Sequence, residues 1–480
     1  MSSLDPEDWD AARASAHRML DDAFDALEHL KDLPAWQPMP AGIRDELQAP
    51  APAQGKDLDA VFADYQRLIA PYGSGNRHPG FMGWAQGGGT IAGMMAELLA
   101  ASLNINCGGR DHAGTAVEAQ VVRWAADIFD FPANAGGVLV TGSSIANFVG
   151  VLAARRAILG PESRRGGIAA ARLTGYASAG AHACLAKGFD MAGLGSTALR
   201  LIPTDQAGRM DMRALAAAIA RDRAAEHVPF LIVGTAGTVD IGAVDDLSAL
   251  ARLAKREGLW LHVDAAFGGL AALVPSLRPQ LAGIERADSI ALDFHKWGQV
   301  QYDAGLILAR DAARLEATFS NPAPYLERDP RGLAAGDVWP CDLGPDLSRG
   351  FRALKIWFTI QTYGLAALGE VIAGTCALAA RLADRVDAEP KLERLAPVGL
   401  NIVCFRYSPP GNGLAGPALD RLNRDIVAEL QLSGRLVPST TWITGTLAIR
   451  AAILNHRTTE AETDLLVEEV CRQGDKLSRE

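Results

Sequence analysis

The spacing of apolar residues divides the chain into segments of different character. Between residue 1 and about 35, apolar side chains recur every three or four positions, which places them on one face of an α-helix. A proline-rich stretch follows, and a second helix is predicted at about 57–70. Such amphipathic helices have no core of their own. We therefore expect residues 1–85 to form a helical arm that packs on the main body or on another copy of the chain.

From about residue 90, short apolar runs alternate with helical patterns. The runs predict strands at 138–141, 172–177, 198–202, 229–234, 259–264, 289–293 and 305–309. Most are separated by about 25 to 35 residues with a helical pattern between them, which indicates an α/β fold with a mostly parallel sheet covered on both faces. The connection from 293 to 305 is too short for a helical crossover, so the last strand is predicted to be antiparallel.

The remainder of the chain predicts a smaller α+β domain. A long helix from Arg352 to Gly364 leads to strands near 400–406 and 446–450, and a closing helix begins at Thr459. The predicted organisation is thus an arm (1–85), a large domain (86–349) and a small C-terminal domain (350–480).

Charge and cysteine content exclude several classes of protein. The formal net charge is −10, with no basic block, which argues against nucleic acid or an anionic membrane as a partner. The six cysteines are scattered and form no C-x-x-C pair, so neither a disulfide framework nor a thiolate metal site is expected. The N-terminus is acidic and unlike a secretory signal, and apolar runs such as 91–103 are too short and charged for a bilayer span. We expect a soluble, cytoplasmic protein with no membrane partner.

Two predicted strand ends carry polar groups: one is suited to binding an anion, and the other places a carboxylate in a buried position. In doubly wound sheets, ligands gather at the carboxyl ends of the strands. The turn Thr141-Gly142-Ser143-Ser144 opens a helix, where free N–H groups and hydroxyls can hold a phosphate, although an ordinary serine N-cap gives the same pattern. Asp264 ends an apolar strand, shares a strand face with His262, and is followed by small residues and glycines. A buried carboxylate there needs a cationic or hydrogen-bonding partner.

A lysine and a histidine lie near two further strand ends. Lys296 is flanked by Phe294 and Trp297, and a lysine in a pocket of low dielectric constant loses proton affinity and becomes an amine nucleophile. His182 follows another strand and, taken alone, is more typical of a partly buried structural histidine. A phosphate cradle, a strand-end carboxylate, a lysine and an imidazole together are what pyridoxal phosphate requires. The carboxylate keeps its pyridine nitrogen protonated, the lysine holds its aldehyde, and helix N–H groups hold its phosphate.

Four motifs resemble one enzyme family. They are WLHVDAA at Trp260–Ala266, HKW at His295–Trp297, GTAGT at Gly234–Thr238 and LSRGFRALKIW at Leu347–Trp357. With them the chain resembles the group II pyridoxal-phosphate-dependent amino acid decarboxylases, which include aromatic-L-amino-acid, glutamate, histidine and diaminobutyrate decarboxylases. The resemblance implies PLP fold type I with a seven-stranded sheet, and a homodimer with shared active sites and the arm wrapped over the second subunit.

The resemblance also assigns roles to individual residues. It makes Lys296 the lysine bound to the cofactor aldehyde and Asp264 the partner of the pyridine nitrogen. It places Ala266 on one ring face and His182 on the other, and Thr238 near the ring hydroxyl or in its supporting shell. The residues it implies on the phosphate side are Ser143, Ser144 and His295, supplemented by Asn147 and by Ser348 from the second subunit. Tyr325, in the loop 321–326, matches the mobile-loop tyrosine that returns a proton after carbon dioxide leaves.

The segment 78–87 matches the family's substrate segment. Phe81 and Trp84 favour a pocket for an aromatic side chain, and no arginine there invites a second carboxylate. Ala85 stands where related enzymes often have another aromatic ring, and Gly87 where a hydroxyl commonly contacts the substrate carboxylate, so a wider pocket that fits an indole or a different substrate is implied. The predicted reaction is decarboxylation of an L-amino acid of the tryptophan, tyrosine, dopa or phenylalanine type to its amine.

Several alternatives stay open from the sequence. The same fold supports aromatic aldehyde synthases, which are associated with phenylalanine in place of the loop tyrosine, decarboxylases of non-aromatic amino acids, aminotransferases and carbon–sulfur lyases. From another class, His262-x-Asp264 and Asp293-x-His295 are compatible with a metal-dependent hydrolase, although no tighter ligand cluster supports a metal. A non-catalytic cofactor-binding protein is the remaining alternative.

Overall fold

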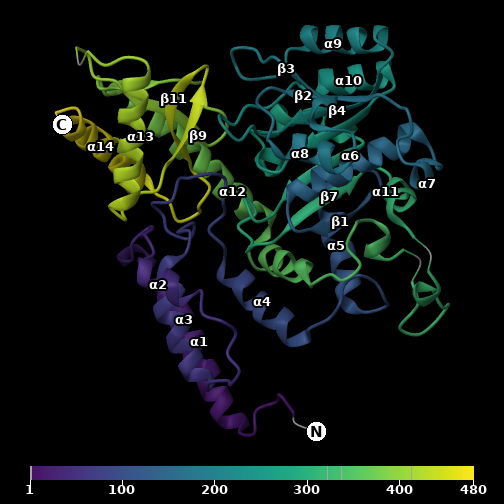
Figure 1. The fold of residues 1–480 in the computed structure, drawn as a ribbon, viewed down its shortest axis with the longest axis horizontal. Helices are drawn as coiled ribbons and strands as arrows, with labels where there is room; N and C mark the ends of the chain where they lie inside the picture. Colours follow the sequence, from purple (N-terminus) through teal and green to yellow (C-terminus); the bar gives the residue numbers. More distant parts are fainter. Residues whose placement is uncertain (1–2, 322, 337, 412, 480) are drawn as a thin grey trace.

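A seven-stranded sheet forms the centre of the larger part of the molecule (Figure 1). The computed structural model describes residues 3–321, 323–336, 338–411 and 413–479. In spatial order the strands are β1 (Gly136–Val140), β7 (Gly305–Ala309), β6 (Ser289–Asp293), β5 (Trp260–Asp264), β4 (Val228–Thr235), β2 (Leu173–Ser178) and β3 (Leu199–Ile202). β7 is antiparallel to both of its neighbours and the other pairs are parallel, so the predicted strands and the antiparallel β7 are confirmed.

Helices cover both faces of this sheet because successive strand residues point to opposite sides. On β4, Leu231 and Val233 pack with one layer of helices, whereas Ile232 packs with the other. The first layer consists of α6 (Ser143–Leu159), α8 (Cys184–Met191) and α11 (Ala312–Phe319). The second consists of α5 (Ala113–Ile128), α9 (Met212–Ala224) and α10 (Leu247–Glu257).

Short helical turns connect these layers and the arm. They are α7 (Ser163–Gly166), η1 (Leu30–Asp32), η2 (Ala70–Tyr72), η3 (Ser196–Ala198), η4 (Gly268–Leu273), η5 (Arg278–Leu281), η6 (Ile284–Arg286), η7 (Pro324–Leu326) and η8 (Pro340–Asp342).

The smaller domain packs a four-stranded antiparallel sheet against helices. Its strand order is β10 (Ser439–Ile443), β11 (Thr446–Ala452), β9 (Ile402–Tyr407) and β8 (Leu392–Arg394), with α13 (Pro417–Leu432) and α14 (Glu460–Leu477) beside it. The sequence analysis missed β8 and β10, which are the edge strands and are polar or short. Thr459 caps α14 as predicted, because its hydroxyl accepts from Ala461 N–H.

A long helix joins the two domains. α12 (Arg352–Ala388) is interrupted at Gly364, whose φ of 76° and ψ of 160° are not helical, so its first section ends where the sequence predicted. Among the described residues α12 is long and apolar enough to cross a membrane by length and composition, a possibility that the sequence analysis had not raised for this segment. However, α12 packs against α5 and α14, and its buried residues belong to the cores of both domains, which is typical of a core helix.

The N-terminal helices extend away from the body as an arm (Figure 1). They are α1 (Trp9–Glu28), α2 (Ala41–Glu46) and α3 (Leu58–Leu68), and α4 (Ile91–Leu103) follows on the near side of the body. Between them the chain returns to the body: Phe81 pairs with Val437, and Met82 lies in the core of the small domain. This return brings the predicted substrate segment to the junction of the two domains.

Candidate cofactor and substrate site

The carboxylate of Asp264 lies at the end of β5 and is almost fully buried. Its Oδ1 accepts a hydrogen bond from the Ala266 N–H at 3.2 Å, and no described residue donates to Oδ2. Burial raises the pKa of Asp264, and the charges of Lys296 and His182 oppose that rise. The site therefore holds a carboxylate with one unshared oxygen, which can accept a hydrogen bond from a protonated ring nitrogen.

Lys296 follows the end of the neighbouring strand β6, in a setting that restricts its movement. Phe294 and Trp297 on either side are buried, and the indole of Trp297 packs on the ring of Phe267 at 4.9 Å between centroids. The Lys296 side chain itself is 20% exposed, and its Nζ lies 3.1 Å from Asp293 Oδ2. A largely buried amine therefore stands one strand away from Asp264, as the sequence predicts.

His295 adds a neutral imidazole beside this amine. Its Nδ1 accepts from the Ala304 N–H at 3.1 Å, which leaves Nε2 directed at Asp293, 3.6 Å from Oδ2. Burial lowers the pKa of His295, and the Asp293 carboxylate partly opposes this effect. Tyr302, which the sequence analysis did not select, packs on the His295 ring with centroids 4.2 Å apart.

The start of α6 brings two serines to the same place. Ser143 is buried, and both its N–H and its Oγ donate to the Asp293 carboxylate, at 2.7 and 2.6 Å. Ser144 is exposed, and its N–H has no hydrogen-bond partner among the described residues. The N-terminus of α6 thus presents donors toward the pocket, although one serine is already engaged by Asp293.

The structure corrects the prediction that Asn147 supplements the phosphate side. Asn147 is fully buried beneath α6, where its Oδ1 bonds His262 Nε2 at 2.8 Å and its Nδ2 reaches Cys184 Sγ at 3.6 Å. Both halves of the amide are used inside the protein, because the helix turns this residue toward the sheet. His262 also bonds Ser289 Oγ at 2.8 Å, and burial lowers its pKa to about 3. With both ring nitrogens occupied, His262 is committed to the core, which argues against the metal-hydrolase alternative.

Thr238 follows the end of β4, and His182 follows the end of β2. Thr238 is buried, and its Oγ1 accepts from the Ala243 N–H at 3.0 Å, so its hydroxyl stabilises the turn and acts from the supporting shell. His182 is exposed, and its Nδ1 accepts from the Cys184 N–H at 3.2 Å, which leaves Nε2 free to face a ligand.

Of the predicted substrate residues, only Trp84 presents a large exposed surface. Trp84 is 54% exposed, and its backbone φ is 49°. The centroid of its ring lies 6.1 Å from that of Phe81. Phe81 is buried against Ala35 and Val437, and Ala85 is buried in the core of the large domain. Phe81 therefore supports Trp84, because its own ring is committed to packing.

Gly87 packs directly against the backbone of Lys296. Its N–H donates to the His295 carbonyl at 3.1 Å, and a Cβ on Gly87 would lie 2.3 Å from the Lys296 carbonyl oxygen and 2.8 Å from that of His295. The expectation that the missing side chain widens the substrate pocket is therefore wrong. Glycine at this position permits a close approach between two backbone segments.

Arg450 is a residue that the sequence analysis missed. It lies in β11 and is 3% exposed, with Nη1 donating to the Trp84 carbonyl at 3.1 Å and to Ser439 Oγ at 3.2 Å. Its Nη2 is buried and has no hydrogen-bond partner among the described residues, and burial lowers the pKa of Arg450. An arginine inside the apolar strand TLAIRAA was the available signal, because a buried cation is expensive unless a partner meets it.

Tyr325 and Ser348 lie on the surface of the chain. Tyr325 is 70% exposed in η7, and the adjacent Pro322 falls outside the described residues. Ser348 is also exposed, but Arg349 beside it is buried and pairs with Glu118. Among the described residues, no hydrogen bond or ion pair links Tyr325 or Ser348 to Lys296 or Asp264.

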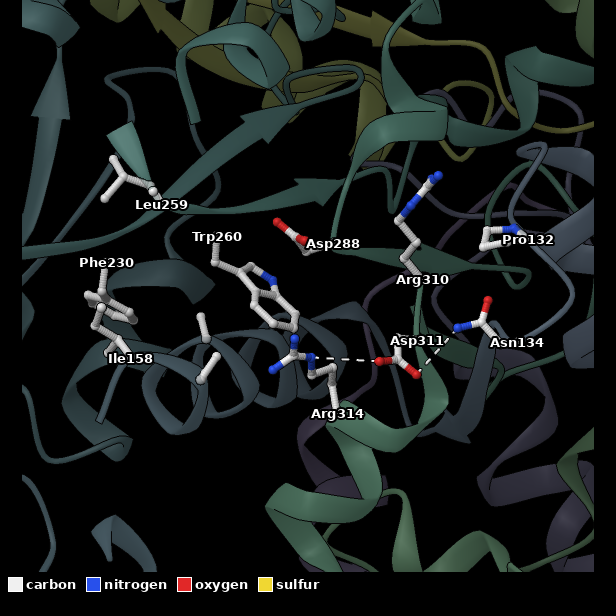
Figure 2. Close-up of a pocket in the computed structure, with 13 residues that line it drawn as sticks. Pro132, Asn134, Ile158, Phe230, Leu259, Trp260, Asp288, Arg310, Asp311 and Arg314 are labelled. Atoms are coloured by element: carbon white, nitrogen blue, oxygen red, sulfur yellow. Dashed lines mark hydrogen bonds and ion pairs between the residues drawn. The ribbon is translucent and has the colours of Figure 1, made fainter. Parts of the chain in front are cut away.

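A cavity of about 450 Å³ lies at the opposite edge of the sheet (Figure 2). Trp260 at the start of β5, Asp288 just before β6 and Arg310 just after β7 line it. In Figure 2 the Arg314 guanidinium approaches Asp311, which also meets Asn134. None of the predicted cofactor residues lines this cavity, which places it apart from the candidate site.

The groups at the carboxyl edge fit pyridoxal phosphate. Asp264 has an unshared oxygen for the pyridine nitrogen, Lys296 has the amine, and the start of α6 has N–H and hydroxyl donors. Two buried hydroxyls at neighbouring strand ends, Ser178 Oγ and Thr235 Oγ1, have no hydrogen-bond partner in the part of the chain that the structure describes. Unpartnered polar atoms of this kind favour a polar ligand.

Comparison with known proteins agrees with this chemistry. The model of the pyridoxal-dependent decarboxylase conserved domain matches residues 40–408. An aromatic-L-amino-acid decarboxylase of Bacillus atrophaeus is 30% identical over 94% of this chain and 92% of the relative, and a phenylacetaldehyde synthase of Arabidopsis thaliana is 30% identical over 94% and 93%. The crystal structure of Oryza sativa TDC with PLP and tryptamine superposes with a TM-score of 0.90 at 26% identity, covering 99% of this chain and all of that one.

Proposed function

Because the chain belongs to the family of pyridoxal-dependent decarboxylases, we propose that it removes the carboxyl group of an aromatic L-amino acid as carbon dioxide and releases the amine. The observation that carries this proposal is the pairing of Asp264, with its unshared carboxylate oxygen, and the Lys296 amine at adjacent strand ends. Pyridoxal phosphate supplies a ring that accepts the electrons left when the carboxyl group departs.

The side chains around that ring divide the remaining work. Asp264 holds a proton at the pyridine nitrogen, and Lys296 holds the aldehyde until the substrate amine replaces it. Ser144 and the N-terminus of α6 would bind the phosphate, and His182 would face the ring with Nε2 available as a donor. Tyr325 returns a proton to the carbon that has lost carbon dioxide.

Two residues support an aromatic α-amino acid as the substrate. Trp84 offers an exposed indole three residues before Gly87, which packs on Lys296, and aromatic rings gain from offset or edge contacts with one another. Arg450 is buried and donates to the Trp84 carbonyl, so it positions the backbone that carries this indole. Both residues approach from the small domain or from the segment that packs on it, so substrate binding depends on the junction of the two domains.

Tyr325 favours the amine as the product. The relatives include an aldehyde synthase as well as a decarboxylase, so overall similarity does not choose between the two outcomes. A tyrosine can deliver a proton to the carbon after carbon dioxide leaves, whereas oxidation to an aldehyde requires that this carbon meet oxygen instead.

The defining experiment is a panel of aromatic and non-aromatic L-amino acids with detection of carbon dioxide, amine, aldehyde and peroxide. Borohydride trapping followed by peptide mapping identifies the lysine that carries the cofactor. We expect carbon dioxide and amine in equal amounts from an aromatic substrate, with label on Lys296. The variant K296A should lose both label and turnover, whereas K255A, which changes a lysine of the same type on α10, should retain both. A keto acid without carbon dioxide, or aldehyde with peroxide as the main product, would contradict the proposal.

We also propose that two copies of the chain build the active sites together. Apolar side chains of the arm and of α4 are exposed: Trp9, Val61, Tyr65, Ile69, Leu98 and Leu103. Burying such a surface against a second copy is favourable at about 25 cal/mol per Å². Tyr325 and Ser348 are exposed on the same chain that positions Lys296, which supports their acting at the site of the other copy.

Complementation between two variants that form no amine tests this arrangement. In a mixture of K296A and Y325F, one site of each mixed dimer combines an intact lysine with an intact tyrosine if the tyrosine crosses between subunits. We expect amine formation to reappear when the two variants are denatured and refolded together, and no amine from either variant alone or from mixing without exchange. Absence of recovery, despite mixed dimers detected by mass, would place Tyr325 at its own chain's site.

A reducing cytoplasm is the compartment that we propose for the protein. All six cysteines are free in the structure, and Cys107, Cys184 and Cys404 are buried. Labelling of unfolded protein from native cells should find six thiols, and a cell fraction enriched in secreted proteins should lack the chain.

A further inference from the structure

Asp293 occupies a position in the site that the roles above leave unexplained. It is the last residue of β6 and is 2% exposed. Its two oxygens accept from the Ser143 N–H and Oγ, and Oδ2 lies 3.1 Å from Lys296 Nζ. One buried carboxylate thus contacts both a phosphate-side donor and the amine that holds the aldehyde.

In this arrangement the Asp293 carboxylate and a cofactor phosphate would compete for the same hydrogen-bond donors. The hydroxyl of Ser143 has one proton, which it already donates to Asp293, and so does its N–H. A phosphate that approaches the start of α6 would meet a carboxylate within the same cradle, in an environment where like charges repel more strongly than in water. The carboxylate and the phosphate would also compete for His295 Nε2, which lies 3.6 Å from Asp293 Oδ2.

The neighbouring residues do not neutralise Asp293 for this purpose. Lys296 is its nearest cation, with Nζ 3.1 Å from Oδ2, but its amine is the group that would hold the cofactor aldehyde. His295 has a lowered pKa because it is buried, which favours the neutral ring. Arg352 and Lys355 nearby are paired with Asp303 and Glu97 respectively.

We propose that Asp293 competes with the cofactor phosphate for Ser143 and thereby weakens the chain's hold on pyridoxal phosphate. Asp293 acts here as a positioning residue, because it acts on the phosphate through Ser143. The inference rests on the cofactor of the proposed function, and borohydride trapping at Lys296 tests that cofactor separately.

The variant D293N tests the competition, with binding as its readout. Asparagine keeps the shape and an acceptor for the Ser143 N–H, but it removes the charge. Protein stripped of cofactor is titrated with pyridoxal phosphate and with pyridoxal, which has the aldehyde but no phosphate. Since any change at Lys296 alters both ligands, the ratio of their affinities isolates the phosphate. We expect the preference for pyridoxal phosphate over pyridoxal to rise about tenfold in D293N. The reason is that a charged carboxylate no longer competes with the phosphate for the Ser143 donors. A preference that is unchanged or lower would overturn the proposal.

Two further variants, D288N and S143A, serve as controls for indirect effects. D288N changes another largely buried carboxylate, whose Oδ2 accepts from the Leu261 N–H at 2.8 Å beside the cavity of Figure 2, and it should leave the ratio unchanged. S143A removes the contested hydroxyl and keeps the proposal testable if D293N does not fold. In the otherwise native chain, S143A should lower the preference for pyridoxal phosphate by less than about threefold, because Asp293 already holds that proton. A loss of about tenfold or more in S143A would show that the phosphate holds the hydroxyl, and would refute the competition.

Discussion

Substitution of Gly87 by alanine should disturb the active-site lysine without touching any ligand. The added Cβ would stand 2.3 Å from the Lys296 carbonyl oxygen, whereas ordinary contacts begin near 3.4 Å, so one of the two backbones must move by about 1 Å. Overpacking of this kind costs about 1–3 kcal/mol. Loss of the Gly87 N–H bond to His295 adds about 1 kcal/mol. We expect G87A to lower the free energy of unfolding by about 2–4 kcal/mol.

The same displacement should affect catalysis more than stability suggests. A shift of about 1 Å in a reacting group reduces the rate by about 100-fold, and here the shift falls on the backbone of Lys296 itself. The assays are urea unfolding, cofactor absorbance and kcat/KM on the preferred substrate. G73A is the matched control, because a Cβ there meets nothing within 4 Å and φ is −69°. If G87A unfolded at the same urea concentration as G73A and turned over substrate as fast, the close approach of the two backbones would not exist as described.

Three further predictions concern single side chains. W84A should raise KM for an aromatic substrate by about tenfold with a smaller change in kcat, because stacking is worth about 0.5–1.5 kcal/mol beyond area; equal loss for a non-aromatic amino acid would contradict the assigned role. Since burial raises the pKa of Asp264, the folded chain binds a proton more tightly than the unfolded chain, so the free energy of unfolding of cofactor-free protein should fall as pH rises from about 4 through that raised pKa. D264N should lack this part of the pH dependence in urea titrations and be more stable at neutral pH, and a wild-type profile identical to that of D264N would refute the assignment. Burial raises the pKa of Cys184 to about 12, so iodoacetamide at about pH 8 should leave Cys184 unlabelled in the folded protein and label it in urea, as read by peptide mass spectrometry.

Local pattern was sufficient for the architecture and for the two central residues. Strands such as β5 and β6 are continuous apolar runs bounded by polar residues, and the parallel connections have the length that a covering helix requires. Because ligands gather at strand ends in such sheets, Asp264 and Lys296 could be selected from their positions alone. Edge strands β8 and β10 escaped because only part of each faces a core, so their composition carries a weak signal.

Contacts between distant segments were decided by the tertiary structure. Asp293 meets Ser143 across 150 positions of the chain, and Arg450 meets the Trp84 carbonyl across 366. The family resemblance implied Asn147 on the phosphate side, yet the rotation of α6 on the sheet turns it to His262. Composition and periodicity describe which residues are apolar and how they repeat, and they therefore determine elements and their order. Which side chains share a pocket depends on how those elements pack, and only the folded chain contains that information.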